Sequence, residues 1–313
     1  MNLDKQPRIF ITGATGFIGR SLICELRSRG YLDLTALVRR TSNTAFLKEN
    51  NVKTVLGDIS DCSSFNDLKG DYDILFHCAG FVADGEEEIL CKVNILGTEN
   101  ICRWALKHKI KKFIYISSVA VNSGNPEIPL TEERPYSATN KYGLSKLDAE
   151  KIVVRFRNSG LPVVIIRPCM VYGEGEPHML PLLSRLLRLR LLILPNLGRP
   201  KLHLVSVRNV AACLAHCMED ERALGGTFHI ADKEVLTVGE IFEIFAKSLK
   251  VPNPIKLSPA TTKFFTLIPF IGKRIKFLCK DRVYSIERLK SILNFTPPYR
   301  AHAELSNSVQ SLK

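Results

Sequence analysis

A short strand that runs directly into three glycines is the feature that most constrains how this chain folds. Residues 9–12 are mostly apolar and favour β-structure, and Gly13, Gly16 and Gly19 follow at intervals of three. Apolar residues at helical spacing begin at Phe17 and continue for about three turns. The sequence therefore predicts a strand, a tight turn and a helix.

The turn has the properties of a phosphate-binding site. Glycine adopts backbone conformations that a Cβ forbids and lets an anion approach the backbone closely. The first turn of the following helix offers unpaired N–H groups and the positive end of a dipole. The glycine spacing differs by one residue from the G-x-G-x-x-G fingerprint of dinucleotide-binding proteins. Three glycines alone also leave a purely structural turn open.

Buried-type strands alternate with helical patterns through the first half of the chain. Beyond Pro168, prolines become frequent and the alternation is irregular. We therefore expect an α/β fold, with a doubly wound parallel sheet in residues 1–168 and a smaller substrate-binding lobe in residues 169–313 that is free to exchange a strand or helix with the sheet. Strands are predicted at 34–38, 52–56, 72–77, 113–117 and 162–167, helices at 86–108, 140–158, 180–189, 207–218 and 241–249, and a capping box at Thr237.

Composition excludes several classes of protein. The net charge of +13 invites a nucleic-acid interpretation, but no basic stripe interleaved with aromatic residues and no nucleic-acid-binding motif is present, so no nucleic-acid partner is expected. The nine cysteines are scattered without a C-x-x-C pair, which indicates reduced thiols and neither a disulfide nor a metal site. Residues 1–7 contain no apolar signal segment, so a cytoplasmic location is expected.

The residues after the predicted strands suggest a cofactor. In dinucleotide-binding sheets, the end of the second strand meets the adenosine ribose, where an acid suits the 2′-hydroxyl of NAD and an arginine suits the 2′-phosphate of NADP. Arg39 and Arg40 occupy this position, and no acid is nearby. A guanidinium binds phosphate through two parallel charge-assisted bonds, so the pair favours NADP(H) over NAD(H), with two solvated arginines as the alternative.

A tyrosine and a lysine are the candidate chemical groups. Tyr142 and Lys146 are four residues apart and share one face of the predicted helix. A neighbouring ammonium is expected to lower the pKa of the phenol and to make it a proton donor and acceptor near neutral pH. Ser117 and Ser118 end the fifth strand, where a hydroxyl would bind the reacting oxygen. The alternative for the pair alone is a solvated helix face.

The order and spacing of these motifs resemble an extended short-chain dehydrogenase/reductase over residues 7–300, nearest to the 3β-hydroxysteroid and sterol dehydrogenase branch. The resemblance rests on the glycine turn, Asp58, His77–Gly80, Val93–Thr98, Ser118, Tyr142-x-x-x-Lys146 and Arg167–Gly173.

This resemblance implies a Rossmann-type fold and a role for each matching residue. Tyr142 would be the acid/base, Lys146 would hold the nicotinamide ribose and Ser118 would orient the substrate oxygen, while Asn94 would support the site and Pro168 would lie near the carboxamide. The candidate catalytic residues are Ser118, Tyr142 and Lys146. The candidate cofactor-binding residues are Gly13, Thr15, Gly16, Phe17, Ile18, Gly19, Arg39, Asp58, Ile59, Ala79, Gly80, Asn94, Ser117, Tyr142, Lys146, Pro168 and Val171.

Departures from the family pattern bear on the reaction. Sugar-nucleotide members usually carry a phosphate-binding arginine where this chain has leucine, within residues 202–210, and dehydratases carry two acids where Val119–Val121 follows Ser118. With the apolar residues 264–270, these departures favour an NADP-linked dehydrogenase or reductase of a lipophilic alcohol or ketone. Arg199 or Lys201 could still bind a phosphate, so a nucleotide-sugar epimerase or dehydratase is the alternative. A non-catalytic NADP-binding regulator is the second alternative.

Three expectations concern partners. The substrate is a small molecule. The resemblance implies a homodimer that pairs through the helices at 86–108 and 140–158. The apolar and basic residues 263–282 motivate the hypothesis of a peripheral membrane contact, with an ordinary substrate-lobe helix and loop as the alternative. Residues 264–279 are too short and too charged to span a bilayer.

Overall fold

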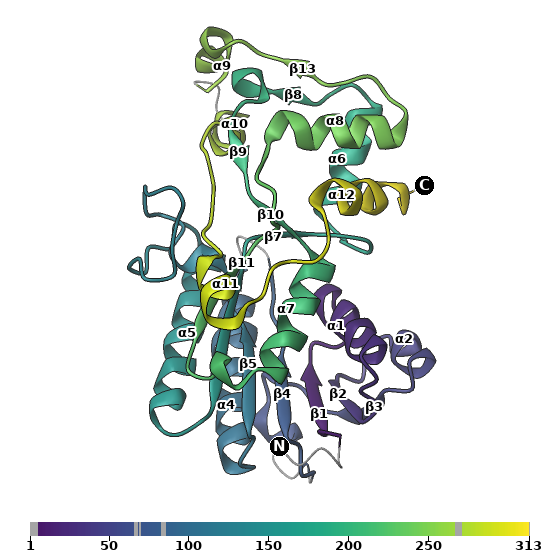
Figure 1. Cartoon of the computed structure of the whole chain (residues 1–313), viewed down its shortest axis with the longest axis vertical. Helices are drawn as coiled ribbons and strands as arrows, with labels where there is room; N and C mark the ends of the chain where they lie inside the picture. Colours follow the sequence, from purple (N-terminus) through teal and green to yellow (C-terminus); the bar gives the residue numbers. More distant parts are fainter. Residues whose placement is uncertain (1–5, 66–67, 69, 83–85, 267–270, 313) are drawn as a thin grey trace.

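A parallel β-sheet forms the centre of the molecule (Figure 1). The computed structural model describes residues 6–65, 68, 70–82, 86–266 and 271–312. The largest sheet in this part of the chain has seven strands in the order β11-β6-β5-β4-β1-β2-β3, and every neighbouring pair is parallel. The strands are β1 (Ile9–Thr12), β2 (Leu34–Val38), β3 (Lys53–Leu56), β4 (Ile74–His77), β5 (Lys112–Ile116), β6 (Val163–Pro168) and β11 (Thr227–Ile230).

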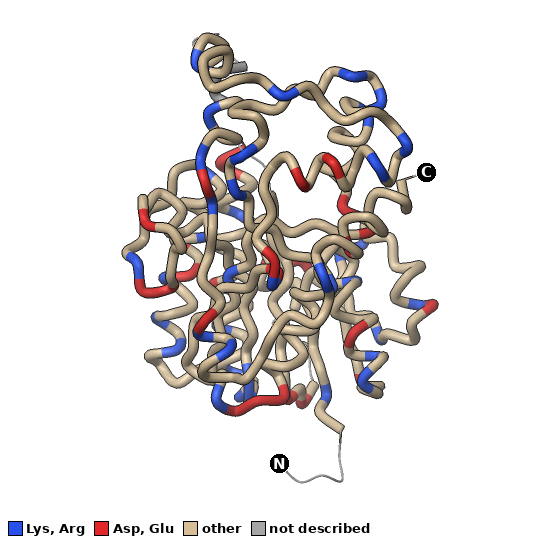
Figure 2. Tube along the Cα trace, turned by 45° about the horizontal axis from the view of Figure 1, so that its top comes forward, with Lys and Arg blue, Asp and Glu red and all other residues tan. Residues whose placement is uncertain are grey.

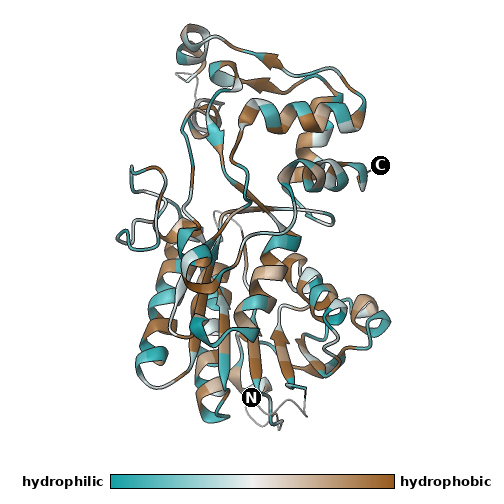
Figure 3. Cartoon of the chain, viewed as in Figure 1, coloured by the Kyte–Doolittle hydropathy of each residue, from teal (hydrophilic) through white to brown (hydrophobic). Residues whose placement is uncertain are grey.

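Alternate residues of each central strand pack on opposite faces of the sheet. In β1, Ile9 and Ile11 belong to one hydrophobic cluster and Phe10 to the other. Helices α1 (Phe17–Ser28) and α7 (Val207–Glu219) cover the first face, and α4 (Gly97–Lys107) and α5 (Lys141–Asn158) cover the second. Both layers are apolar inside, as the brown strands of Figure 3 show. The predicted doubly wound sheet is confirmed.

The C-terminal half of the chain contributes to the sheet layers. Strand β11 adds to β6, α7 packs against α1, and α11 (Glu287–Leu293) packs against β11. The helix predicted at 207–218 therefore belongs to the sheet layers and not to the lobe, and β11 is a strand that the sequence pattern does not predict, because its four residues lie outside the regular alternation. A division at residue 168 therefore remains a proposal about function.

A smaller lobe lies beyond the carboxyl ends of the strands (Figure 1). Its core is formed by α6 (Met179–Arg188), α8 (Val238–Leu249) and α12 (Ala301–Gln310). The predicted capping box is confirmed, because Thr237 Oγ1 accepts from the Glu240 amide at 3.2 Å and the Glu240 carboxylate accepts from the Thr237 amide at 2.7 Å. The other elements are β7 (Met170–Tyr172), β8 (Ile193–Leu194), β9 (Lys201–Leu202), β10 (Leu204–Ser206), β12 (Leu236–Thr237), β13 (Ile255–Lys256), α9 (Pro259–Phe265) and α10 (Ile271–Leu278).

The remaining elements connect the strands. The helix predicted at 86–108 consists of α3 (Glu87–Leu90), the π-helix η2 (Cys91–Leu96) and α4, and α2 (Ala45–Glu49) lies between β2 and β3. Among the described residues, no helix combines the length and apolar character needed to cross a membrane. Residues 1–5, and residues 267–270 of the apolar-basic stretch 263–282, lie outside the described part of the chain.

Candidate active site

The glycine turn lies between β1 and α1, and its three glycines have different reasons to be glycine. Gly13 has φ +70°, and a Cβ there would lie 2.5 Å from the amide nitrogen of Ala79. A Cβ on Gly19 would collide with the carbonyl oxygen of Gly13. Gly16 is exposed, and a Cβ there would meet only that carbonyl oxygen, at 3.2 Å. Steric contacts inside the protein therefore account for glycine at positions 13 and 19. They account for it much less well at position 16.

The start of α1 fits the phosphates of a dinucleotide. Gly16 is the N-cap of this helix, and among the described residues no side chain caps the N–H groups of its first turn. An uncapped helix N-terminus next to an exposed glycine provides the donors and the dipole that bind a pyrophosphate. Thr15, Phe17 and Ile18, which the sequence analysis assigned to the cofactor, lie in this turn and are partly buried.

A second open position lies at Gly80, beyond the end of β4. A Cβ on this exposed glycine would lie 3.5 Å from Asn94 Oδ1 and 3.9 Å from Lys146 Nζ, which are ordinary contact distances. The space in front of Asn94 and Lys146 is thus free of protein side chain at Gly80.

Asn94 holds the loop after β4 against the start of α5. Its side chain exchanges two hydrogen bonds with the backbone of Phe81, at 2.8 and 3.0 Å, and its amide donates to Ser145 Oγ at 2.9 Å. Ser145 Oγ in turn donates to the Tyr142 carbonyl at 2.8 Å. Asn94 lies in the π-helix η2, a geometry that often marks functional sites. The supporting role that the family resemblance implies for Asn94 has a physical basis here.

Ser118 and Tyr142, two of the candidate catalytic residues, lie close together at the carboxyl edge of the sheet. Ser118 follows β5 and caps the short helix Val119–Val121, accepting from the Ala120 amide at 3.1 Å. Burial raises the pKa of the Tyr142 phenol, and a hydrogen bond with the Ser118 side chain partly offsets this rise in pKa. The sequence analysis predicted a lowered pKa for Tyr142, and in the chain alone that prediction is wrong because desolvation outweighs the other interactions.

Lys146 follows Tyr142 by one turn of α5, and its side chain is buried. Its Nζ donates to the Ile116 carbonyl at 2.6 Å and lies 4.7 Å from the centre of the Tyr115 ring. Burial lowers the pKa of Lys146 to about 8, although the Glu150 charge acts in the opposite direction. The ammonium is therefore fixed at the carboxyl edge of the sheet by a backbone carbonyl and an aromatic face.

A buried ion pair lies behind the two serines. The Arg167 Nε donates to Glu150 Oε2 at 3.1 Å, and both side chains are almost fully buried. Ser117 Oγ also donates to Glu150, and Tyr136 donates to the same carboxylate at 2.9 Å. Ser117 therefore has a partner inside the protein, and the cofactor-binding role assigned to it remains a prediction.

His77, at the end of β4, completes the buried polar layer. Its ring bonds Thr12 Oγ1 at 2.7 Å and Thr98 Oγ1 at 3.0 Å. Burial, reinforced by the Lys146 charge, lowers the pKa of His77 to about 3, so the imidazole is neutral at physiological pH. His77 links β1, β4 and α4 rather than facing solvent.

The remaining candidate residues also lie at this edge of the sheet. Arg39 and Arg40 follow β2 and are both exposed. Asp58 accepts from the Ser60 amide and hydroxyl at 2.9 and 2.8 Å, while Ile59 is buried against Gly97. The other residues assigned to the cofactor are Ala79, which follows β4, Pro168, which ends β6, and Val171 in β7.

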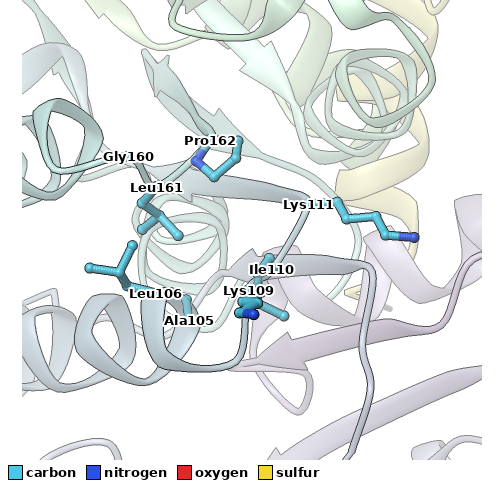
Figure 4. Close-up of a pocket in the computed structure, with 8 residues that line it drawn as sticks. All are labelled: Ala105, Leu106, Lys109, Ile110, Lys111, Gly160, Leu161 and Pro162. Carbon is cyan, nitrogen blue, oxygen red and sulfur yellow. The ribbon is translucent and has the colours of Figure 1, made fainter.

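The opposite edge of the sheet carries a surface hollow of about 290 Å³ (Figure 4). Lys111 and Pro162 line it just before β5 and β6 begin, together with residues such as Leu106 at the end of α4. The hollow lies at the amino ends of strands whose carboxyl ends carry Ser118 and Pro168. It is therefore remote from the candidate site.

Sequence reasoning missed the partners that hold the site together. Glu150 lies four residues after Lys146 on the same helix, so helical spacing gave a signal that was not used. Arg167 was noted as part of a motif, but its ion pair with Glu150 depends on the packing of α5 against β6. The Ile116 carbonyl that receives Lys146 left no trace in the sequence, because any residue supplies a carbonyl.

Three features define the class of protein: a parallel sheet, an uncapped glycine turn after its first strand, and a Ser/Tyr/Lys set at its carboxyl edge. Together they are typical of nucleotide-dependent enzymes of the short-chain dehydrogenase/reductase type. The family model for the NAD dependent epimerase/dehydratase family matches residues 9–231. The chain belongs to this family, whose members are NAD(P)-dependent epimerases, dehydratases and reductases.

Individual proteins show the same relationship. A UDP-glucose 4-epimerase from Vibrio cholerae is 28% identical, with 98% of this chain and 96% of the relative covered. Sterol demethylase protein B from Methylococcus capsulatus is 30% identical over 53% of this chain and 52% of its own. The crystal structure of gox2253 superposes with a TM-score of 0.80 at 27% identity and covers 97% of each chain. These similarities confirm the predicted family and fold.

Proposed function

We propose that the protein is an NADP(H)-linked dehydrogenase or reductase of a lipophilic alcohol or ketone. The observation that carries this proposal is the gathering of three side chains at the carboxyl edge of the sheet: Ser118 after β5, and Tyr142 and the buried Lys146 one turn apart on α5. A phenol held in this way donates a proton to a carbonyl oxygen in one direction and accepts it from a hydroxyl in the other.

In the proposed reaction the nicotinamide cofactor supplies or accepts the hydride. During reduction, the Tyr142 phenol donates its proton to the developing alkoxide, and the Ser118 hydroxyl donates a hydrogen bond to the same oxygen. The Lys146 ammonium stabilises the phenolate that remains, because an adjacent positive charge favours the charged form of the phenol. Asn94 keeps the loop after β4 and the start of α5 in register, so the phenol and the cofactor site stay aligned.

Arg39 and Arg40 support the preference for NADP(H). Both guanidinium groups are exposed, and neither has an ion-pair partner among the described residues. We expect Arg39→Ala to weaken binding of NADP about tenfold to a hundredfold and to leave NAD nearly unchanged, because a charge-assisted hydrogen bond contributes roughly 1.5–3 kcal/mol. Titration calorimetry with both cofactors measures this, with Lys48→Ala on α2 as the control. Equal losses for the two cofactors would remove Arg39 from 2′-phosphate recognition.

The ion pairs of two arginines near the site support a lipophilic substrate. Arg167 pairs with Glu150, and Arg208 pairs with Glu304 at 3.0 Å, so neither is free for a substrate phosphate. By the family resemblance, a leucine within residues 202–210 stands where sugar-nucleotide members usually carry a phosphate-binding arginine. The similarity to sterol demethylase protein B points in the same direction.

A nucleotide-sugar epimerase is the second candidate. The similarity to a UDP-glucose 4-epimerase extends over almost the whole chain, and Arg199 and Lys201 are exposed. Thermal unfolding with NADP, NAD and UDP-glucose separates the candidates, because a ligand that binds only the native state raises the melting temperature. We expect a rise with NADP and none with UDP-glucose, and oxidation of NADPH by lipophilic ketones. A rise with UDP-glucose and its conversion would establish the epimerase, whereas NADP binding without turnover of any carbonyl or alcohol would favour a regulator.

We also propose a cytoplasmic homodimer. Ile89, Leu96 and Leu144 are exposed apolar residues on α3, η2 and α5, which lie side by side on the face predicted for dimerisation. Sedimentation velocity should show a dimer that Leu96→Glu with Leu144→Glu converts to a monomer. A monomeric wild-type protein would end this proposal, and cell fractionation tests the location.

A further inference from the structure

The net charge of the protein is confined to two segments of the lobe. Residues 177–202 and 244–280 contain thirteen lysines and arginines and no aspartate or glutamate, while the rest of the chain contains 31 residues of each sign. The entire formal charge of +13 therefore belongs to these two segments, which we call the basic cap.

The two segments of the basic cap form one continuous region of the structure. Strands β8 and β13 pair in parallel, with Ile193 opposite Ile255. The Leu197 amide of the first segment also donates a hydrogen bond to the Leu257 carbonyl of the second, at 2.8 Å. Helix α6 packs against α8, and α10 packs against α9. Figure 1 shows α9, β8 and β13 at the end of the lobe that is farthest from the sheet, and blue segments gather there in Figure 2.

The cations of the basic cap are exposed and largely unpaired. Within the described part of the chain, Lys256 is the one cap residue with an ion pair, to Glu243 at 2.6 Å. The exposed cap residues for which the structure shows no such partner are Arg185, Arg188, Arg190, Arg199, Lys201, Lys247, Lys250, Lys263, Lys276 and Lys280. Elsewhere on the surface some basic side chains do have acidic partners, as Arg29 does with Glu219 at 2.8 Å. The cap thus presents positive charge that the protein does not neutralise.

Exposed apolar side chains lie among these cations. Leu189 and Leu191 flank Arg190 at the end of α6, and they are 55% and 63% exposed. Across the strand pair, Ile255 is 64% exposed, and Phe264 on α9 is 65% exposed. A hollow of about 230 Å³ lies between the two segments of the basic cap. Arg190 lines it from the first segment and Ile255 from the second. Exposed apolar and basic side chains therefore occur together on this part of the lobe.

We propose that the basic cap docks on the surface of an anionic lipid membrane. Unpaired lysines and arginines are attracted to the negative surface potential, and exposed leucine, isoleucine and phenylalanine side chains enter the boundary between head groups and acyl chains. A nucleic-acid partner explains the charge but not the aliphatic side chains, which offer no stacking surface to a base. The proposal extends the predicted contact at residues 263–282 to α6, β8 and β13, and it holds whether or not Ser118 and Tyr142 catalyse a reaction.

Vesicle flotation of the full-length chain tests the charge requirement. The protein should float with vesicles of phosphatidylcholine and phosphatidylserine at low salt, remain unbound with phosphatidylcholine alone, and dissociate at high salt. The triple variant Arg185→Gln, Arg188→Gln, Arg190→Gln should partition on the order of a hundredfold more weakly, since each basic residue near an anionic surface contributes about 1 kcal/mol. The control Lys48→Gln, Lys107→Gln, Lys109→Gln, which removes the same charge from the sheet domain, should bind like the wild type.

A second variant tests insertion of apolar side chains. Leu189→Ser, Leu191→Ser and Phe264→Ser together should weaken partitioning at least tenfold while all cations remain. The residues are exposed, so circular dichroism and the melting temperature should match the wild type and exclude misfolding. Wild-type protein that stays unbound at low salt, equal losses in the charge variant and its control, or full binding by the apolar variant would each overturn the proposal. Tighter binding to RNA than to anionic vesicles would overturn it in favour of a nucleic-acid partner.

Discussion

Polar side chains are buried and paired at the carboxyl edge of the sheet, whereas the described ones of the basic cap are exposed and mostly unpaired. At the sheet edge, Lys146, His77 and Glu150 are buried, and each is held by specific partners in the protein. In the cap, cations such as Arg188 are exposed without an ion pair, and apolar residues such as Phe264 face solvent. Side chains that are buried and hydrogen-bonded within the protein are preorganised for catalysis. Exposed cations and apolar side chains without partners are suited to binding another surface.

The largest expected effect at the sheet edge is on turnover. Tyr142→Phe removes the proton donor and should lower turnover about 10²–10⁴-fold, the usual range for loss of acid/base catalysis, while cofactor binding persists. NADPH oxidation with the best ketone measures turnover, and calorimetry measures binding. Tyr31→Phe is the control. Tyr31 follows the C-terminal end of α1, away from the glycine turn, and its phenol donates to Glu219 at the end of α7. Turnover near the wild-type value in Tyr142→Phe would break the assignment of this edge as the reactive one.

The next effect is on stability and tests how tightly the same edge is built. Glu150→Gln leaves Arg167 charged and buried, which should lower the free energy of unfolding by about 3 kcal/mol or more. Glu133→Gln is the control, since its pair with Arg288 is exposed and should contribute less than about 1 kcal/mol. Urea unfolding followed by circular dichroism gives both values.

A double substitution keeps this test informative if Glu150→Gln fails to fold. Glu150→Met combined with Arg167→Met removes both charges and should recover much of the lost stability, because no buried charge remains unpaired. Equal costs for Glu150→Gln and Glu133→Gln would show that the buried pair does not organise the edge.

A smaller effect is expected at Gly80, where the edge is open. Gly80→Val places a side chain in front of Asn94 and Lys146 and should weaken binding of NADP about tenfold through lost ribose hydrogen bonds. For Gly80→Ala the free energy of unfolding should change by less than about 0.5 kcal/mol, because the added Cβ makes only ordinary contacts. Gly80→Ala should fall between the wild type and Gly80→Val in cofactor affinity. A loss of stability without a loss of affinity would show that Gly80 serves packing instead.

The difference between the two regions also explains what the sequence could reveal. Gly13, Gly16 and Gly19, the central strands and Tyr142 with Lys146 were predictable because local spacing along one strand, turn or helix determines them. The pKa of Tyr142 was predicted in the wrong direction because it depends on burial, which only the assembled fold determines.

Contacts between distant parts of the chain were the other limit. Strand β11 pairs with β6 about sixty residues earlier, and its four residues give too short a pattern to recognise. The ion pair of Glu150 with Arg167 joins a helix to a strand, and neither residue alone indicates the other. In the basic cap, the excess of lysine and arginine was visible in the sequence, but pairing of β8 with β13 was needed to bring the two segments together.

The smallest expected effect lies in the cap and completes the contrast. Phe264→Ser should change the free energy of unfolding by less than about 0.5 kcal/mol, because the ring is 65% exposed and its removal leaves no buried cavity. Phe228→Ser, at a fully buried ring between β11 and the helices of the sheet, is the matched comparison and should cost about 3 kcal/mol or more. Urea unfolding measures both, and a large cost for Phe264→Ser would mean that this side chain serves the core. In that case the cap would be a part of the protein's own packing, and its apolar residues would not be available to enter a membrane.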